Sequence, residues 1–159
     1  MTEKEEQAKV DAIFDEYLQE KKQDMREILF RGKREDTGFW VEGYYFKNDK
    51  GTIIFTYPYH ANFWGVDVVV RVDDESIGQY TGLKDKNEKK IFEGDILKEC
   101  DVIHEGEIQI SGKFYKVEMR KGCWVLSNDE TWDFLETNAK TCEIIGNIHE
   151  NPELLEAKE

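Results

Sequence analysis

Residues 77–95 bring glycines, carboxylates, lysines and a tyrosine close enough in the chain to form a ligand site. The spacing of glycine and lysine is close to that of a phosphate-binding loop, but Leu83 separates the second glycine from the lysine and Asp85 stands where a hydroxyl is required. The carboxylates are not spaced as calcium ligands either, because Lys89 occupies a ligand position and Lys90 the glycine position. The sequence therefore predicts neither a phosphate loop nor a calcium site in this stretch.

Residues 77–95 are better explained as a connector between two parts of the fold. Gly78 and Gly82 permit positive φ, and Thr81 and Asp95 can accept hydrogen bonds from backbone N–H groups of the loops. We predict that the residues of this connector have a structural role first and a ligand-binding role second. They are Gln79, Tyr80, Thr81, Gly82, Asp85, Lys86, Glu93, Gly94 and Asp95.

A second candidate site is the loop of residues 57–65, which holds four aromatic residues and a histidine. Such a group can form a recognition surface for a peptide or a nucleic-acid base. The alternative is a flap that covers the apolar face of a sheet. The candidate contact residues are Tyr57, Tyr59, His60, Phe63 and Trp64.

No motif in the sequence supports catalysis or metal binding. Cys100 and His104 would lie ~13 Å apart on a strand that rises about 3.3 Å per residue, which is too far for one metal ion. The sequence has no G-x-S-x-G nucleophile elbow, no H-E-x-x-H and no dinucleotide fingerprint. We therefore expect a protein that is not an enzyme and needs no metal or cofactor.

The formal net charge of −13 argues against direct binding to nucleic acids or to anionic membranes, since both depend on basic residues. No apolar run approaches the roughly 18 residues that span a bilayer, and the N-terminus has no signal-peptide pattern. The three cysteines form no C-x-x-C pair. These features predict a reduced, cytoplasmic protein outside the membrane.

Thr2 to about Gln23 has the pattern of an amphipathic helix, with Thr2 and Glu5 as a capping box. We predict a helical extension over residues 1–24, whose apolar stripe packs either on the β domain or on the same helix of another subunit. The stripe consists of Val10, Ile13, Phe14, Tyr17 and Leu18.

From residue 25 the apolar period shortens towards 2, which predicts a β-rich domain over residues 25–155. Its first half, residues 25–76, is expected to be an antiparallel meander with a hairpin turn at Asn48–Gly51. The valine run of the last strand favours a strand buried on both faces. The expected strands are Ile28–Arg31, Phe39–Phe46, Thr52–Thr56 and Val66–Val72.

The connector leads into short, closely spaced strands over residues 96–150, which predict a small barrel-like, SH3-like half. Asn151 as N-cap and Pro152 as first residue predict a short terminal helix before the tail of residues 156–159. The fold class is thus mainly β, within α+β. The expected strands are Ile96–Lys98, Glu107–Ile110, Lys113–Met119, Cys123–Leu126 and Glu143–Ile148.

Two long blocks, Ile77–Asp95 and Glu143–Leu155, resemble the YopX family, small proteins encoded mainly by phages and prophages, and Met25–Arg31 resembles its usual beginning. The resemblance implies a β-rich fold with a barrel-like C-terminal part, a bacterial host and assembly into oligomers. It implies no established activity. Glu88 stands where family members often have glycine, which argues against a type I′ turn there.

These features support, as leading hypothesis, a non-enzymatic phage or prophage accessory protein that assembles with itself and binds an unidentified phage or host macromolecule. An acidic regulatory or anti-defence protein that imitates nucleic acid is the alternative, motivated by the negative charge. A small-ligand enzyme with a pocket beside Gln79, Tyr80 and Asp95 is the third.

Overall fold

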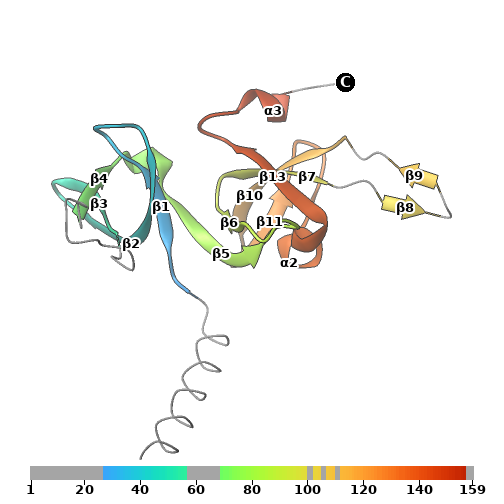
Figure 1. Ribbon diagram of the computed structural model, residues 1–159, viewed down its shortest axis with the longest axis horizontal. Coiled ribbons are helices and arrows are strands. Elements are labelled where there is room, and N and C mark those ends of the chain that lie inside the picture. Colours follow the sequence, from blue (N-terminus) through green and yellow to red (C-terminus); the bar gives the residue numbers. More distant parts are fainter. Residues whose placement is uncertain (1–26, 57–68, 100–101, 105–106, 110–111, 157–159) are drawn as a thin grey trace, which may run out of the picture.

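The computed structural model describes residues 27–56, 69–99, 102–104, 107–109 and 112–156. The predicted helix of residues 2–23, the aromatic loop of residues 57–65 and Cys100 lie outside the described residues. The described part is mainly β, as predicted, with antiparallel sheets and a few short helices (Figure 1). Two lobes lie side by side, and one strand runs through both.

The first lobe is an antiparallel meander, because β4, β3, β2 and β1 are neighbours in sheet order. The hairpin between β2 and β3 turns at Asp49 and Lys50, with Asn48 paired to Gly51, as the turn residues predict. Ile54, Val70 and Val72 form the core of this lobe on one face of the sheet. The strands are β1 (Phe30–Lys33), β2 (Trp40–Asn48), β3 (Gly51–Phe55) and β4 (Val69–Val72), followed by the 3-10 helix η1 (Asp74–Ser76).

Two strand predictions in this lobe are wrong in detail. The first strand begins at Phe30, and Ile28 is 60% exposed outside it. The last strand is not buried on both faces: Val70 is buried, whereas Val69 is 51% exposed. The reason is that β4 is the edge strand of an antiparallel sheet with only one face on the core.

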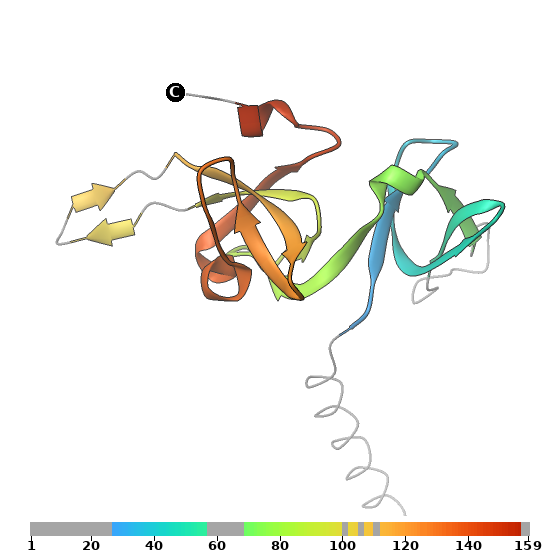
Figure 2. The same cartoon turned by 180° about the vertical axis from the view of Figure 1, so that it is seen from behind.

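The second lobe is a five-stranded antiparallel sheet in the order β12-β11-β10-β7-β13. Its core consists of Ile91, Leu97, Val117, Leu126, Leu135, Ala139 and Cys142. Its elements are β6 (Lys90–Phe92), β7 (Asp95–Glu99), β10 (Phe114–Arg120), β11 (Cys123–Ser127), β12 (Trp132–Phe134), α2 (Leu135–Asn138), η2 (Ala139–Thr141), β13 (Cys142–Asn147) and α3 (Glu153–Glu156). A separate two-stranded ribbon, β8 (Val102–His104) and β9 (Glu107–Gln109), projects away from this lobe (Figure 2).

The short terminal helix is present as α3, which begins at Glu153, one residue after the predicted start at Pro152. Asn151 Oδ1 accepts a hydrogen bond from the Asn147 backbone N–H at 3.4 Å. The Asn151 carbonyl accepts one from the Leu154 N–H at 3.1 Å. The side chain therefore holds the helix against β13.

Strand β5 (Gly78–Lys84) belongs to both lobes. Its first residues pair with β1, at Phe30↔Gln79, and its later residues pair with β6, at Tyr80↔Phe92. The register shifts after Tyr80, where Gly82 has φ +85°. The prediction of positive φ at Gly78 is wrong: this glycine is required because a Cβ would lie 2.5 Å from the Glu93 carbonyl oxygen.

Candidate functional site

Arg31 and Asp95 form a buried ion pair where the two lobes meet. Arg31 Nη2 lies 2.6 Å from Asp95 Oδ1, and Asp95 is only 1% exposed. The guanidinium also lies over the rings of Trp40 and Phe92, at 4.8 and 5.0 Å from their centroids. We call Arg31, Trp40, Phe92 and Asp95 the junction cluster, because it joins β1 and β2 of the first lobe to β6 and β7 of the second.

Burial raises the pKa of the Asp95 carboxyl, since desolvation penalises its charged form, and the Arg31 guanidinium opposes this effect. Asp95 Oδ2 additionally accepts a hydrogen bond from the Phe92 N–H at 2.8 Å. The carboxylate thus has two partners inside the protein. These contacts fix the turn that leads from β6 into β7.

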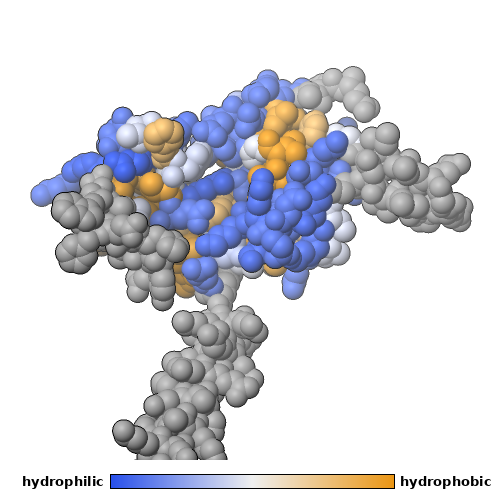
Figure 3. All heavy atoms as spheres, viewed as in Figure 1, coloured by the Kyte–Doolittle hydropathy of each residue, from blue (hydrophilic) through white to orange (hydrophobic). Residues whose placement is uncertain are grey.

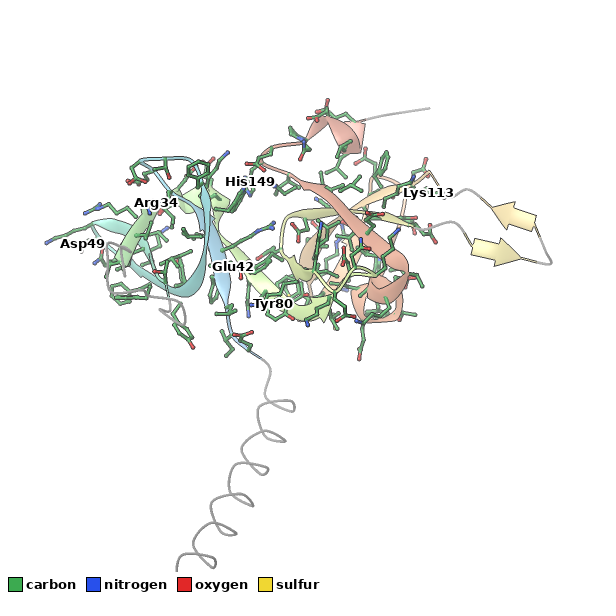
Figure 4. The ribbon with its side chains drawn as sticks, in the orientation of Figure 1. Arg34, Glu42, Asp49, Tyr80, Lys113 and His149 are labelled. Carbon is green, nitrogen blue, oxygen red and sulfur yellow. The ribbon has the colours of Figure 1, made fainter. Side chains whose placement is uncertain are left out.

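The chain after β13 closes the upper side of the junction. Trp40 Nε1 donates to Glu150 Oε1 at 3.1 Å, and Lys33 Nζ lies 3.3 Å from the same oxygen. The His149 ring lies 5.8 Å from the Trp40 ring, and Figure 4 places His149 between the lobes. Desolvation, followed by the charge of Arg31, lowers the pKa of His149, so its neutral form is favoured.

Lys90 contacts Glu42 and Tyr80, two residues that Figure 4 labels. Its ammonium lies 3.5 Å from Glu42, 3.6 Å from Glu27 and 5.6 Å from the centroid of the Tyr80 ring. Tyr80 is buried with Leu29, and its ring is tilted against the Phe92 ring with a centroid distance of 5.5 Å. Burial raises the pKa of the Tyr80 phenol.

The other connector residues are engaged in contacts within the chain. Thr81 Oγ1 donates to the Ile91 carbonyl at 2.9 Å and accepts from the Leu83 N–H at 3.1 Å. Lys86 Nζ lies 2.7 Å from Glu143 Oε2. The Gln79 carbonyl accepts a hydrogen bond from the Glu93 N–H, and the Gly94 carbonyl accepts one from the Ile148 N–H. The Glu93 carbonyl accepts a hydrogen bond from the Arg31 guanidinium.

Asp85 is fully buried and accepts three backbone hydrogen bonds. Its Oδ1 accepts from Asn87 at 2.8 Å and Lys89 at 3.0 Å, and its Oδ2 accepts from Ile144 at 3.1 Å. Desolvation raises the pKa of Asp85, but the three N–H donors outweigh it, and the net shift is downward. One carboxylate therefore fastens the loop between β5 and β6 to β13.

Glu88 adopts the left-handed backbone conformation in this loop, with φ +62°. Its N–H donates to the Asp85 carbonyl at 3.0 Å and closes a four-residue turn. The central residues of this turn, Lys86 and Asn87, do not have positive φ, so it is not a type I′ turn, as the sequence indicated. The Glu88 carboxylate lies 2.6 Å from Lys140 Nζ on an exposed surface.

We expect Glu88→Gly to raise the melting temperature by about 2–4 °C, because glycine relieves the strain of positive φ. Glu88→Gln keeps the strain and removes the charge, so it should give no such rise. Differential scanning calorimetry of the two variants checks this, and a rise for both would assign the effect to charge.

A second feature is an open apolar face on the first lobe, which we call the open face. Tyr44, Phe46, Phe55 and Val69 are 50%, 49%, 39% and 51% exposed. The register Tyr44↔Phe55↔Val69 places three of them in one row across β2, β3 and β4, and Phe46 lies two residues further along on the same face. Figure 3 shows apolar residues at the surface of this lobe among hydrophilic ones.

Sequence reasoning missed both the junction cluster and the open face. The signal for the open face was the run Tyr44-Tyr45-Phe46, since consecutive aromatics place apolar side chains on both faces of a strand. The candidate residues Tyr57, Tyr59, His60, Phe63 and Trp64 lie outside the described residues.

Within the described residues, no group of three or more histidine, cysteine, aspartate or glutamate side chains is arranged to hold a metal ion. None of the helices in this part of the chain is both long and apolar enough to cross a membrane.

A family model described as YopX protein matches residues 29–156. The chain is also similar to the crystal structure of protein EF1440 from Enterococcus faecalis. The two share 25% sequence identity and a TM-score of 0.50, over 82% of this chain and 99% of that one. No curated protein sequence matches.

Proposed function

The chain belongs to the YopX family, and from that premise we propose that it is a non-enzymatic accessory protein of phage or prophage origin that assembles with itself and binds a macromolecular partner. We further propose an SH3-like closure for the second lobe and a cytoplasmic location in the bacterial host. The proposal depends on one observation above all, which is the open face.

The open face supports an interaction role because each of its apolar side chains, Tyr44, Phe46, Phe55 and Val69, is between 39% and 51% exposed. Monomeric proteins seldom expose such a patch without using it, and tyrosine and phenylalanine are enriched at the centres of interfaces. With a net charge of −13, a protein surface is a more suitable partner than a nucleic acid.

The burial of the connector supports a role without catalysis. Tyr80 and Asp95 are 6% and 1% exposed, and Asp95 is paired with Arg31. A small ligand beside these groups would have to separate the two lobes and break the ion pair. An exposed sheet face can bind a macromolecule without separating the lobes or breaking the ion pair.

Light scattering over a wide range of protein concentrations tests the proposal. The full chain should show a mass above the 18.8 kDa of one copy, and Phe46→Ser should lower it. Phe134→Ser is the matched control, because Phe134 is 48% exposed on β12 in the other lobe and Phe46 is 49% exposed. A full chain that stays at 18.8 kDa at all concentrations would contradict self-assembly.

A further inference from the structure

Strand β12 lies at one edge of the five-stranded sheet, and among the described strands it pairs only with β11. At the turn that joins them, the Asn128 N–H donates to the Thr131 carbonyl at 3.0 Å, so the backbone groups of Thr131 face β11. Successive residues of an antiparallel strand direct these groups to opposite sides, so the N–H and carbonyl of Trp132 point away from β11. In the part of the chain that the structure describes, neither group forms a hydrogen bond. Trp132 therefore offers a donor and an acceptor to an added strand.

The next outward-facing residue of this edge, Phe134, already has partners within the chain. Its N–H donates to Asp133 Oδ1 at 2.7 Å, and its carbonyl accepts from Asn138 Nδ2 at 2.9 Å. The open part of the edge is thus limited to Trp132, and such short edges resist aggregation. An added strand must gain the rest of its affinity from side chains.

The side chains of Trp132 and Phe134 form an exposed aromatic pair on one face of β12. Their ring centroids lie 5.6 Å apart in an edge-to-face arrangement, and the residues are 50% and 48% exposed. The register Ser127↔Trp132 and Val125↔Phe134 places the pair on the same face as two fully buried residues of β11. The pair is therefore anchored on the β11 side and open on the other, as interface anchors are.

The surroundings of this aromatic pair are acidic. Between Lys121 and Lys140 the sequence has no lysine or arginine and four carboxylates. None of these carboxylates forms an ion pair with another described residue. Such a surface attracts cations and repels a second copy of a chain with a net charge of −13. The four residues are Asp129, Glu130, Asp133 and Glu136, all exposed.

Arginine is the side chain that suits this surface best. Its guanidinium stacks on a tryptophan ring and also pairs with carboxylates, so one residue satisfies both features of the edge. A residue that exchanges both backbone hydrogen bonds with Trp132 lies directly opposite it, with its side chain on the same face. An arginine at that position meets the Trp132 ring.

We infer that the edge of β12 binds an extended, arginine-containing segment of a protein partner. The segment pairs with Trp132 through its backbone and places an arginine over the ring. This surface belongs to the second lobe, whereas the open face belongs to the first. The inference goes beyond the proposed function, because it names a partner surface that needs no self-assembly.

Fluorescence anisotropy with a labelled decapeptide of alternating arginine and valine tests the pairing on the full chain. The peptide should bind with saturation below about 1 mM, and the same peptide with glutamate in place of arginine should not. Two methylated versions then test the backbone. Methyl groups on the arginine nitrogens block the side that faces Trp132, and methyl groups on the valine nitrogens block the opposite side. The first should bind at least about fivefold more weakly than the second, because it loses the hydrogen bonds.

Variants of the chain locate the peptide. Trp132→Ala should weaken binding at least about tenfold, as truncation of an interface anchor does, and Trp132→Phe should recover part of the loss. Asp129→Asn with Glu130→Gln should weaken binding about threefold and reduce its dependence on salt. Glu35→Gln with Asp49→Asn is the matched control, since both residues are exposed acids of the first lobe, and it should bind like the wild type.

Three results would overturn the inference. They are a wild type that does not bind the arginine peptide, methylated peptides that bind equally, and a Trp132→Ala variant that binds like the wild type. The mass of the chain separates these results from the self-assembly proposed above. A monomer that binds the peptide keeps this inference and contradicts self-assembly, whereas an assembled chain that does not bind it contradicts only this inference.

Discussion

Replacing Asp95 by alanine is expected to lower the free energy of unfolding by about 3–5 kcal/mol, since removal of one partner leaves the other charge of a buried ion pair uncompensated. Arg31 lies 2.6 Å from Asp95 and its side chain is only 14% exposed, so water cannot replace the carboxylate easily. Urea unfolding measures the loss. Asp95→Asn keeps the volume, and most of the loss should remain with it.

Two controls identify the ion pair as the cause. Arg31→Met combined with Asp95→Leu removes both charges and should recover much of the stability, because apolar pairs of similar volume often replace buried ion pairs. Lys47→Met breaks an exposed ion pair with Asp74 that has a similar separation of 2.7 Å, and it should change stability little. If Asp95→Ala stays as stable as the wild type but no longer self-associates, Asp95 is a binding residue and the connector is a site.

Asp85→Ala is expected to cost about 2–4 kcal/mol, because it leaves the N–H groups of Asn87, Lys89 and Ile144 without their acceptor. Asn128→Ala is a matched control, since Asn128 Oδ1 also accepts two N–H groups in a turn, from Glu130 and Thr131, but in contact with water. Its cost should be clearly smaller. Equal costs would mean that Asp85 only shapes its own turn.

The two aspartates should differ in their dependence on pH. The folded-state pKa of Asp85 is lowered from 3.8, so its stabilisation is fully present above that value and is lost as the pH falls below it. Asp85→Asn should therefore flatten the loss of stability in acid. The folded-state pKa of Asp95 is raised, so its titration favours the folded state at low pH and opposes it as the pH rises. Asp95→Asn should therefore not reduce the loss of stability that the protein shows in acid.

The parts of the fold that sequence could predict depend on local chemistry. Asn48-Asp-Lys-Gly51 specifies a hairpin by its own turn preferences, and the alternation of Lys113–Met119 specifies strand β10 without reference to other elements. Asp95 and Thr81 were correctly expected to accept loop N–H groups, because short polar side chains beside turns have few other uses.

The missed features depend on contacts between distant residues. Arg31 meets Asp95 across 64 positions, and the Asp85 carboxylate meets Ile144 across 59. The residues near Arg31 in the sequence do not indicate that its guanidinium pairs with the Asp95 carboxylate or that it lies over the rings of Trp40 and Phe92. The exposure of the Val69 side chain was equally hidden, because a run of valines fits a covered face and an open one alike.

The shared strand β5 also has a consequence for how the chain folds during synthesis. All strands of the first lobe, with β5 as their neighbour, have been made once residue 84 has left the ribosome. Strand β7, in contrast, can be fully paired only after β10 and β13 have been synthesised, and β13 ends at Asn147. We expect the first lobe to form early and to present β5 as a template on which β6 and the later strands assemble. A nascent chain stalled after Glu99 and before Phe114 would expose β7 with neither of its partners, and such an unpaired strand is a template for aggregation.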